Sequence, residues 1–119
     1  MTGFIFVGLG GAVGAMLRYA ISLVPYKHTF PLPILIINII GALLIGYIAG
    51  LAIKKDMPQS MILFLKTGLC GGFTTFSTFS LEAYELLKAG NYVQTVLYIL
   101  LSVIGCVIGV MSGIAISKT

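Results

Sequence analysis

The stretch GLCGGFTTFSTFS, residues 68–80, combines glycines, hydroxyls and phenyl rings in an otherwise apolar part of the chain. Gly71 and Gly72 are followed by the β-branched residues Thr74 and Thr75, and both kinds of residue weaken an α-helix locally. A break here would free backbone carbonyls, which are hard oxygen ligands suited to a small cation such as Na⁺. The helix that resumes after the break would present unpaired amides and the positive end of its dipole. The stretch therefore predicts a helix broken at Gly71–Thr75 that handles ions.

Phe76 and Phe79 follow the predicted break and are three residues apart, so they share one face of a helix. The edge of a phenyl ring is positive, and the surrounding side chains add hydroxyl donors, namely Thr75, Ser77, Thr78 and Ser80. Ring edges and donors together suit a small, strongly hydrated anion that has to shed its water. The alternative is a pair of core phenylalanines beside hydroxyls that bond to the carbonyls of their own helix.

Two further polar residues, Asn38 and Arg18, lie inside apolar runs, where polar groups are costly and therefore suggest a function. The amide of Asn38 either bonds to a neighbouring helix or faces a pore as a donor to an anion. Arg18 either anchors its helix at the lipid headgroups or supplies a fixed positive charge in a watery vestibule. The residues alone leave both pairs of alternatives open.

On the last apolar run, Tyr98, Ser102 and Cys106 follow one another at intervals of four residues and form a weakly polar stripe on one helix face. Cys70 and Cys106 have no CxxC spacing and belong to no Cys/His cluster, so we expect neither a disulfide nor a metal site at their sulfurs. The residues leave the role of Glu82, near the far end of the third run, undecided.

The elements that hold these residues are predicted to be transmembrane helices. The chain has 119 residues, of which 59% are hydrophobic and 8% charged, and its mean hydropathy is +1.12. These values predict an integral membrane protein and exclude a soluble enzyme. One all-α domain over residues 1–119 would contain four membrane-spanning runs, at about Gly3 to Val24, Leu32 to Ile53, Ser60 to Leu87 and Tyr92 to Ser117. No Lys or Arg precedes the first run and no A-x-A cleavage signal follows it, so we expect it to be retained rather than removed as a signal peptide.

Glycines recur at helix-packing spacing in three of these runs. They are Gly10 and Gly14, then Gly46 and Gly50, then Gly105, Gly109 and Gly113. Such small faces either pack helices within one chain or build an oligomer, and the spacing alone fits both.

The lysines of the loops and ends are divided almost evenly between the two sides of the membrane. With four spans, Lys54, Lys55 and Lys118 would lie on one side, and Lys27 and Lys88 on the other. Orientation depends on a clear excess of Lys and Arg on one side. So weak a bias permits insertion in both orientations and pairing as an antiparallel homodimer. The net charge of +4 gives no reason to expect a nucleic-acid partner.

These residues and their order resemble the Fluc-type fluoride channels, also called the CrcB family. The likeness rests on GGAVGAMLRY in the first run, INIIG around Asn38 and, above all, GLCGGFTTFSTF in the third run. It implies a dual-topology, antiparallel homodimer of four-helix subunits with two pores. The pores would passively export cytoplasmic fluoride across the plasma membrane of a prokaryote and so confer resistance to fluoride.

The resemblance also implies roles for individual residues. The main-chain carbonyls of Gly71 and Thr74 from both subunits would hold a structural, untransported Na⁺ at the centre of the dimer. The ring edges of Phe76 and Phe79 would face fluoride along the pores. The remaining implied site residues are Asn38 as a pore-facing donor, Thr78, Tyr98 and Ser102 along the pore, and Arg18 in the vestibule.

Two positions depart from the pattern of that family. The first is Ile34, four residues before Asn38, where the family often has Thr. The second is Cys106, where the family often has Ser on its fourth helix. Both changes remove a hydroxyl, so the resemblance does not define the donors outside the central motif.

Two other functions fit part of the pattern. Small multidrug-resistance transporters are similar in length and also have four spans, but they need a carboxylate in the first span to exchange protons for a cationic drug. The first run here contains Arg18 and no acidic residue. A non-transporting membrane scaffold would use the glycines for packing, but it would not need a polar break in its third span.

Overall fold

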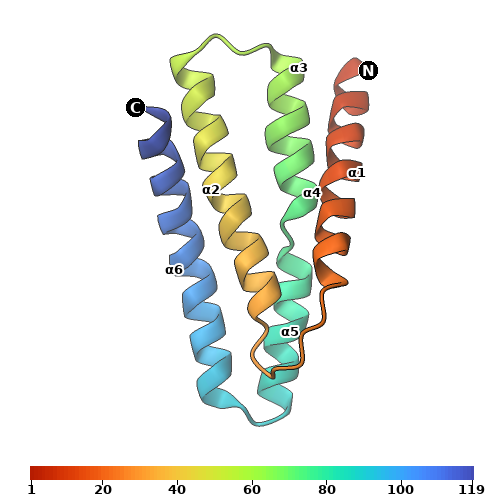
Figure 1. Ribbon diagram of the computed structural model, residues 1–119, viewed down its shortest axis with the longest axis vertical. Coiled ribbons are helices and arrows are strands. Elements are labelled where there is room, and N and C mark those ends of the chain that lie inside the picture. Colours follow the sequence, from red (N-terminus) through yellow and green to blue (C-terminus); the bar gives the residue numbers. More distant parts are fainter.

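Three long apolar helices make up most of the computed structural model, which describes residues 1–119 (Figure 1). They are α1 (Thr2–Ser22), α2 (Leu32–Lys54) and α6 (Tyr92–Ser117). Each contains a window of mean hydropathy between 1.7 and 2.6 and is long enough to cross a membrane. Their bounds lie within two residues of the first, second and fourth runs expected from the sequence. The chain contains no strand, so the predicted all-α class is confirmed.

The third apolar run forms a helical row with one interruption instead of one unbroken helix (Figure 1). The row consists of α3 (Gln59–Ile62), the π-helix η1 (Leu63–Cys70), α4 (Gly71–Phe73) and, after the interruption, α5 (Phe76–Lys88). The interruption consists of Thr74, with φ −84° and ψ 158°, and Thr75, with φ −150° and ψ 119°. Both residues are extended, and the predicted break in this helix is therefore confirmed at the two threonines.

The two glycines before the interruption remain helical, which corrects the expectation that they unwind the chain. Gly71 has φ −63° and ψ −39°. A Cβ atom at Gly72 would collide with the backbone of Gly11 on α1, whereas a Cβ atom at Gly71 would meet nothing within 4 Å. The missing side chain of Gly72 thus lets α1 and α4 touch, and the interruption begins two residues later.

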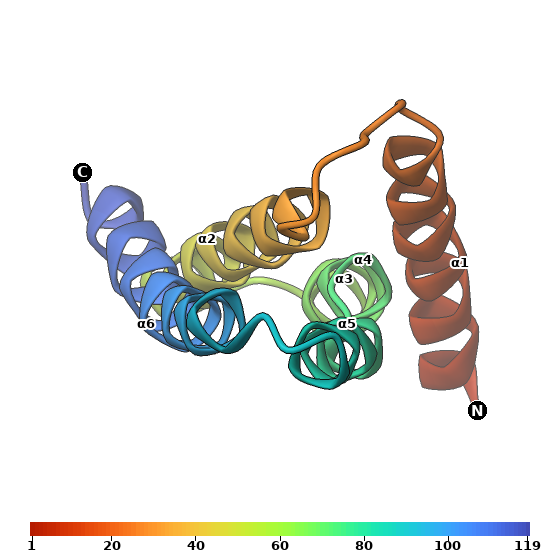
Figure 2. The ribbon, with the colours of Figure 1, turned by 90° about the horizontal axis from the view of Figure 1, so that it is seen from below.

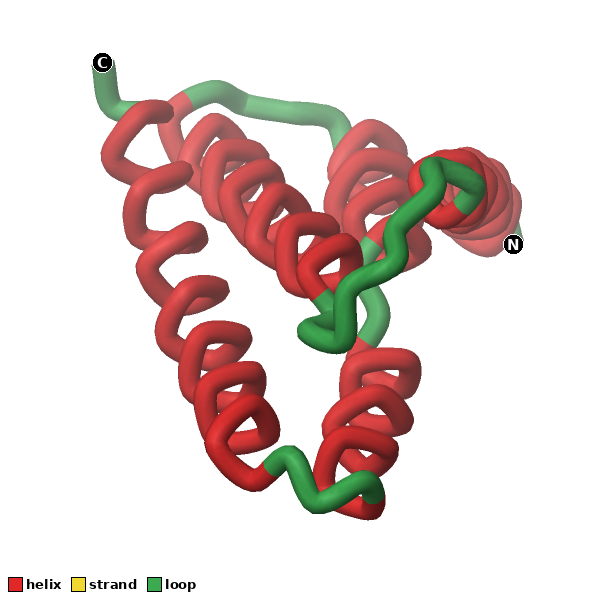
Figure 3. The backbone as a smooth tube through the Cα atoms, turned by 60° about the horizontal axis from the view of Figure 1, so that its bottom comes forward, coloured by secondary structure: helices red, strands yellow, loops and turns green.

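The helices pack mainly as two pairs, α1 against η1 and α4, and α2 against α6 (Figure 2). Figure 3 shows the interruption as a short non-helical piece between α4 and α5. Each pair closes over glycines, since a Cβ atom at Gly14 would collide with the backbone of η1 and one at Gly113 with the backbone of α2. The small-residue faces predicted from the sequence are therefore used for packing within this chain.

Both termini and the α2–α3 connection lie at one end of the molecule, and the α1–α2 and α5–α6 connections lie at the other end (Figure 1). The sharp α5–α6 turn contains Gly90 with φ 84°, a conformation that glycine adopts without strain. The three long helices and the interrupted row α3–α5 lie side by side along the long axis, and α1 and α2 end short of the turn that joins α5 to α6 (Figure 1).

Few side chains are fully enclosed. Only 23 of the 119 residues are buried, and the core is a cluster that includes Ile37, Phe73, Phe79 and Tyr98. Large apolar side chains face outward along all three long helices. In a membrane, lipid or a partner helix covers such surfaces, since helix association there does not depend on burying them within one chain. The burial pattern is that of a membrane protein.

Candidate functional site

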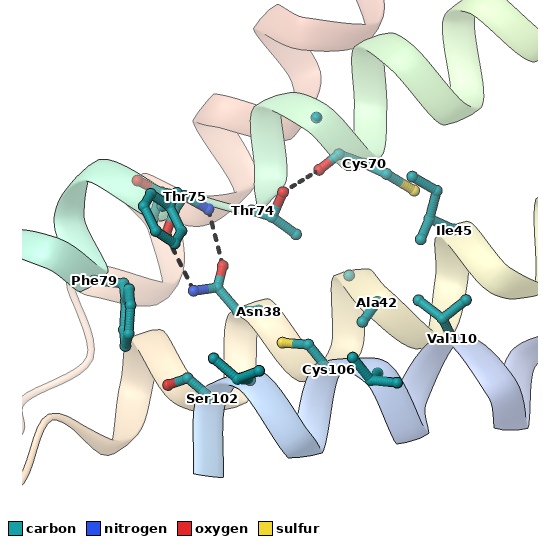
Figure 4. A pocket seen from close by; sticks show the side chains of 15 residues that line it. Asn38, Ala42, Ile45, Cys70, Thr74, Thr75, Phe79, Ser102, Cys106 and Val110 are labelled. Carbon is teal, nitrogen blue, oxygen red and sulfur yellow. Dashed lines mark hydrogen bonds between the residues drawn. The ribbon is translucent and has the colours of Figure 1, made fainter. Parts of the chain in front are cut away.

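An open groove of about 430 Å³ runs between α2, α6 and the interruption (Figure 4). Apolar side chains form most of its walls, and the polar groups are few. It brings together six of the residues predicted to form the site, namely Asn38, Gly71, Thr74, Phe76, Phe79 and Ser102. These residues come from α2, from α6, from α4 and α5 on either side of the interruption and from the interruption itself, so the groove is where the fold concentrates its candidate chemistry.

The side chain of Asn38 on α2 is bonded twice to the backbone of Thr75 (Figure 4). The Thr75 N–H donates to Asn38 Oδ1 at 2.8 Å, and Asn38 Nδ2 donates to the Thr75 carbonyl at 3.1 Å. The amide thus replaces, at the interruption, the partners that an unbroken helix would give to Thr75. Of the two alternatives for Asn38, the bond to a neighbouring helix is formed, and the second N–H of the amide makes no hydrogen bond within the chain.

Two backbone carbonyls beside the interruption lack their helical donors. In an unbroken helix the N–H of Thr75 would bond to the carbonyl of Gly71, but it donates to Asn38. The N–H of Thr78 would bond to the carbonyl of Thr74, but it donates to the hydroxyl of Thr75 at 3.1 Å and so caps α5. Gly71 and Thr74 both line the groove. Their carbonyls are the kind of hard oxygen ligand that holds a small hard cation.

The two phenylalanines after the interruption are neighbours in different environments. Their ring centroids are 5.5 Å apart with an interplanar angle of 48°. Phe79 is buried at 8% exposure, whereas Phe76 is 78% exposed on the open side of the groove. The sequence predicted their shared helix face, but the difference in burial depends on where the neighbouring helices stop. The groove therefore has one fixed and one uncovered aromatic ring.

Tyr98 lies behind the groove, against the ring of Phe79 at a centroid distance of 5.0 Å. It is completely buried, and its hydroxyl donates to Glu82 Oε1 at 2.7 Å. This pair, which joins α5 to α6, was missed in the sequence, because the two residues are 16 positions apart and only the turn at Gly90 brings them together. The sequence did contain a signal for this pair, because both residues are polar, lie inside apolar runs and therefore need partners.

Ser102 and Cys106 stand on the α6 wall of the groove, one helical turn apart. The Ser102 hydroxyl is buried and has no hydrogen-bond partner within the chain. Native structures rarely leave such a group unpaired. A polar occupant of the groove, either water or an ion, would supply the missing partner.

Arg18 and Thr78 lie outside the groove. Arg18 Nε donates to the carbonyl of Gly72 at 3.3 Å, which ties α1 to α4 just before the interruption. Neither alternative drawn from the sequence included this bond. The Thr78 hydroxyl accepts from the Thr75 hydroxyl at 3.2 Å, within the cap of α5. Both residues thus contact the segments on either side of the interruption.

Comparisons with known proteins agree on one family. Residues 5–114 match the family described as CrcB-like protein, Camphor Resistance (CrcB). A protein of Ruminiclostridium cellulolyticum named fluoride-specific ion channel FluC is 45% identical over 123 residues, covering 100% of this chain and 95% of that protein. A protein of Methylobacterium sp. (strain 4-46) with the same name is 43% identical, covering 98% of this chain and 94% of that protein. A third protein of that name, from Azobacteroides pseudotrichonymphae, is 44% identical and covers 84% of both chains.

Proposed function

The chain belongs to the CrcB family, and from this premise we propose that it is a fluoride-selective ion channel, not an enzyme. Conduction is passive and needs neither ATP nor a covalent step. The observation that carries the proposal is the groove between the apolar helices. A helix interruption, two aromatic rings and an unpaired buried hydroxyl meet there. Such a site suits a small anion that exchanges its water for a few protein donors.

Within this proposal the groove replaces part of the hydration shell of fluoride. The Ser102 hydroxyl has no other partner, and the amide of Asn38 keeps one N–H after its bond to Thr75. The positive ring edges of Phe76 and Phe79 add weak attraction without a fixed charge. Because each contact is weak, the ion is held loosely enough to leave. Tyr98 and Thr78 act from behind the walls, Tyr98 by supporting Phe79 and Thr78 by its bonds to Thr75.

The carbonyls of Gly71 and Thr74 are proposed to hold a structural Na⁺ that is not transported. The fit rests on their lost helical donors and on the presence of both residues at the groove. When bound, the cation supplies a fixed positive charge beside the path of the anion. Arg18, which is bonded to the neighbouring carbonyl of Gly72, would add positive potential in a vestibule on the α1 side.

The working unit is proposed to be an antiparallel homodimer in the plasma membrane of a prokaryote. The row α3–α5 would make the fourth crossing of each subunit, beside the three long helices. A second copy inserted the other way would cover the open side of the groove, where the ring of Phe76 is 78% exposed. The near balance of lysines between the two ends permits both insertions. In the cell such a channel would let accumulated fluoride leave and so confer resistance.

The test is fluoride efflux from liposomes that contain the purified protein. With fluoride inside and a K⁺ ionophore present to carry compensating charge, a fluoride electrode should record fast release. Chloride-loaded liposomes should release little. No fluoride release, or equal release of chloride, would overturn the proposal. Transport of a cationic drug in exchange for protons would instead favour a small multidrug-resistance transporter. Such exchange needs a carboxylate in the first span, and α1 contains no acidic residue.

A further inference from the structure

The groove contains a thiol that the proposed conduction mechanism does not use. Cys106 on α6 is free, partly exposed and part of the groove lining. Figure 4 shows its sulfur directed toward Asn38, whereas the sulfur of Cys70 is directed toward Ile45. Cys70 lines the same groove but is only 2% exposed. The two thiols therefore differ in access.

A second observation concerns the side chain one turn before Cys106 on the same wall of the groove. Ser102, which precedes Cys106 by one turn on the same helix face, is 6% exposed, and its hydroxyl has no partner within the chain. A buried hydroxyl of this kind needs a water molecule or an ion beside it. Cys106 is the next side chain along the same wall, so any group added to its sulfur would enter the groove beside Ser102.

We propose that Cys106 is a modification site in the ion path, reactive toward soft metal cations that take a single thiolate ligand, and that its occupation closes the path. The proposal rests on the proposed function, because the consequence concerns fluoride flux. With methylmercury chloride, a sulfur–mercury bond forms, chloride leaves the mercury, and the thiol proton passes to water. No oxidation or reduction is involved. Soft thiolate sulfur is a preferred ligand of such cations.

The geometry explains why such an adduct would stop conduction. The added mercury and its methyl group would project toward the amide of Asn38 and stand one turn from the hydroxyl of Ser102. The adduct would place an apolar methyl group where fluoride needs hydrogen-bond donors. Gly105 and Gly109 hold this part of α6 close to α2, since a Cβ atom at either would press on Ile39 or Ala42. The wall therefore cannot easily retreat from the adduct.

The experiment treats the channel in liposomes with methylmercury chloride and measures both fluoride efflux and the intact mass of the protein. We expect efflux to fall to the level of protein-free liposomes, with one adduct at Cys106, and to recover after washing with a dithiol. Cys106→Ser should conduct fluoride and resist the reagent. Cys70→Ser, the matched control from the same groove, should conduct and remain sensitive.

The outcomes separate this proposal from the function on which it rests. No fluoride efflux before treatment would overturn the channel, while the mass measurement would still test the site. An adduct at Cys70 alone, or none at either thiol in the folded protein, would overturn the modification site. An adduct at Cys106 with unchanged efflux would overturn the claim that its occupation closes the path.

Discussion

Replacing Asn38 tests whether one side chain holds the helix interruption open. Asn38→Leu keeps a similar volume but removes both bonds to Thr75, at 2.8 and 3.1 Å. Hydrogen bonds between helices in a membrane contribute about 0.6 kcal/mol on average and about 1.7 kcal/mol at most. Two such bonds predict a loss of about 1–3 kcal/mol in the free energy of unfolding. Freed from Asn38, the Thr75 N–H can also return to the Gly71 carbonyl, which would remove a proposed Na⁺ ligand and lower fluoride flux.

The assay pairs unfolding in mixed micelles with fluoride efflux from liposomes. Ser80→Ala is a suitable control, because it removes a bond of 2.9 Å between the Ser80 hydroxyl and the Phe76 carbonyl that is exposed and internal to α5. An exposed change of this kind is expected to alter the free energy of unfolding by no more than about 0.5 kcal/mol. If Asn38→Leu unfolds like the control and conducts fluoride at the unaltered rate, then Asn38 does not maintain the interruption.

Three further substitutions separate packing from conduction. Gly72→Ala should destabilise the protein by about 1–3 kcal/mol through its collision with α1, whereas Gly71→Ala, with open space around the new Cβ atom, should not; equal unfolding midpoints would contradict this. Phe76→Ile should reduce fluoride efflux, because it removes the ring edge that the proposal places along the ion path; full efflux would refute the role of the ring. Tyr98→Phe should cost about 1–3 kcal/mol by removing the buried bond to Glu82, and the same loss in a Glu82→Gln background would show that the two groups are not coupled.

Much of the fold follows from hydropathy and local propensity. The three long helices match apolar runs, because a membrane span is set by length and composition over about 20 residues. The interruption was also predictable, since Thr74 and Thr75 favour extended backbone. The helical state of Gly71 and Gly72 was not predictable from local propensity, and the close contact of Gly72 with Gly11 on α1 is with a residue far away in the sequence. No residue pattern in Leu63–Cys70 predicts the π-helix η1.

The candidate site was predictable as a set of residues but not as a set of bonds. Asn38 was identified as unusual, but the sequence was compatible both with a bond to a neighbouring helix and with a pore-facing donor. The fold brings Asn38 against Thr75, which is 37 residues away in the sequence. The bond from Arg18 to Gly72 spans 54 residues and has no local cause. A polar group in an apolar run indicates that a partner exists. Which partner it is depends on how the helices pack.

The number of residues in the π-helix η1 sets the direction in which the side chains after it point. A helix turns by a fixed angle at each residue, so deleting one residue within Leu63–Cys70 would turn everything after it relative to α1 and α2. Gly72 would leave α1, and Thr75 would leave Asn38. The connections at residues 23–31 and 55–58 have no such constraint, because they lie outside the helices. Insertions and deletions acquired during evolution should therefore accumulate in these connections and spare η1, even where substitutions within it are tolerated.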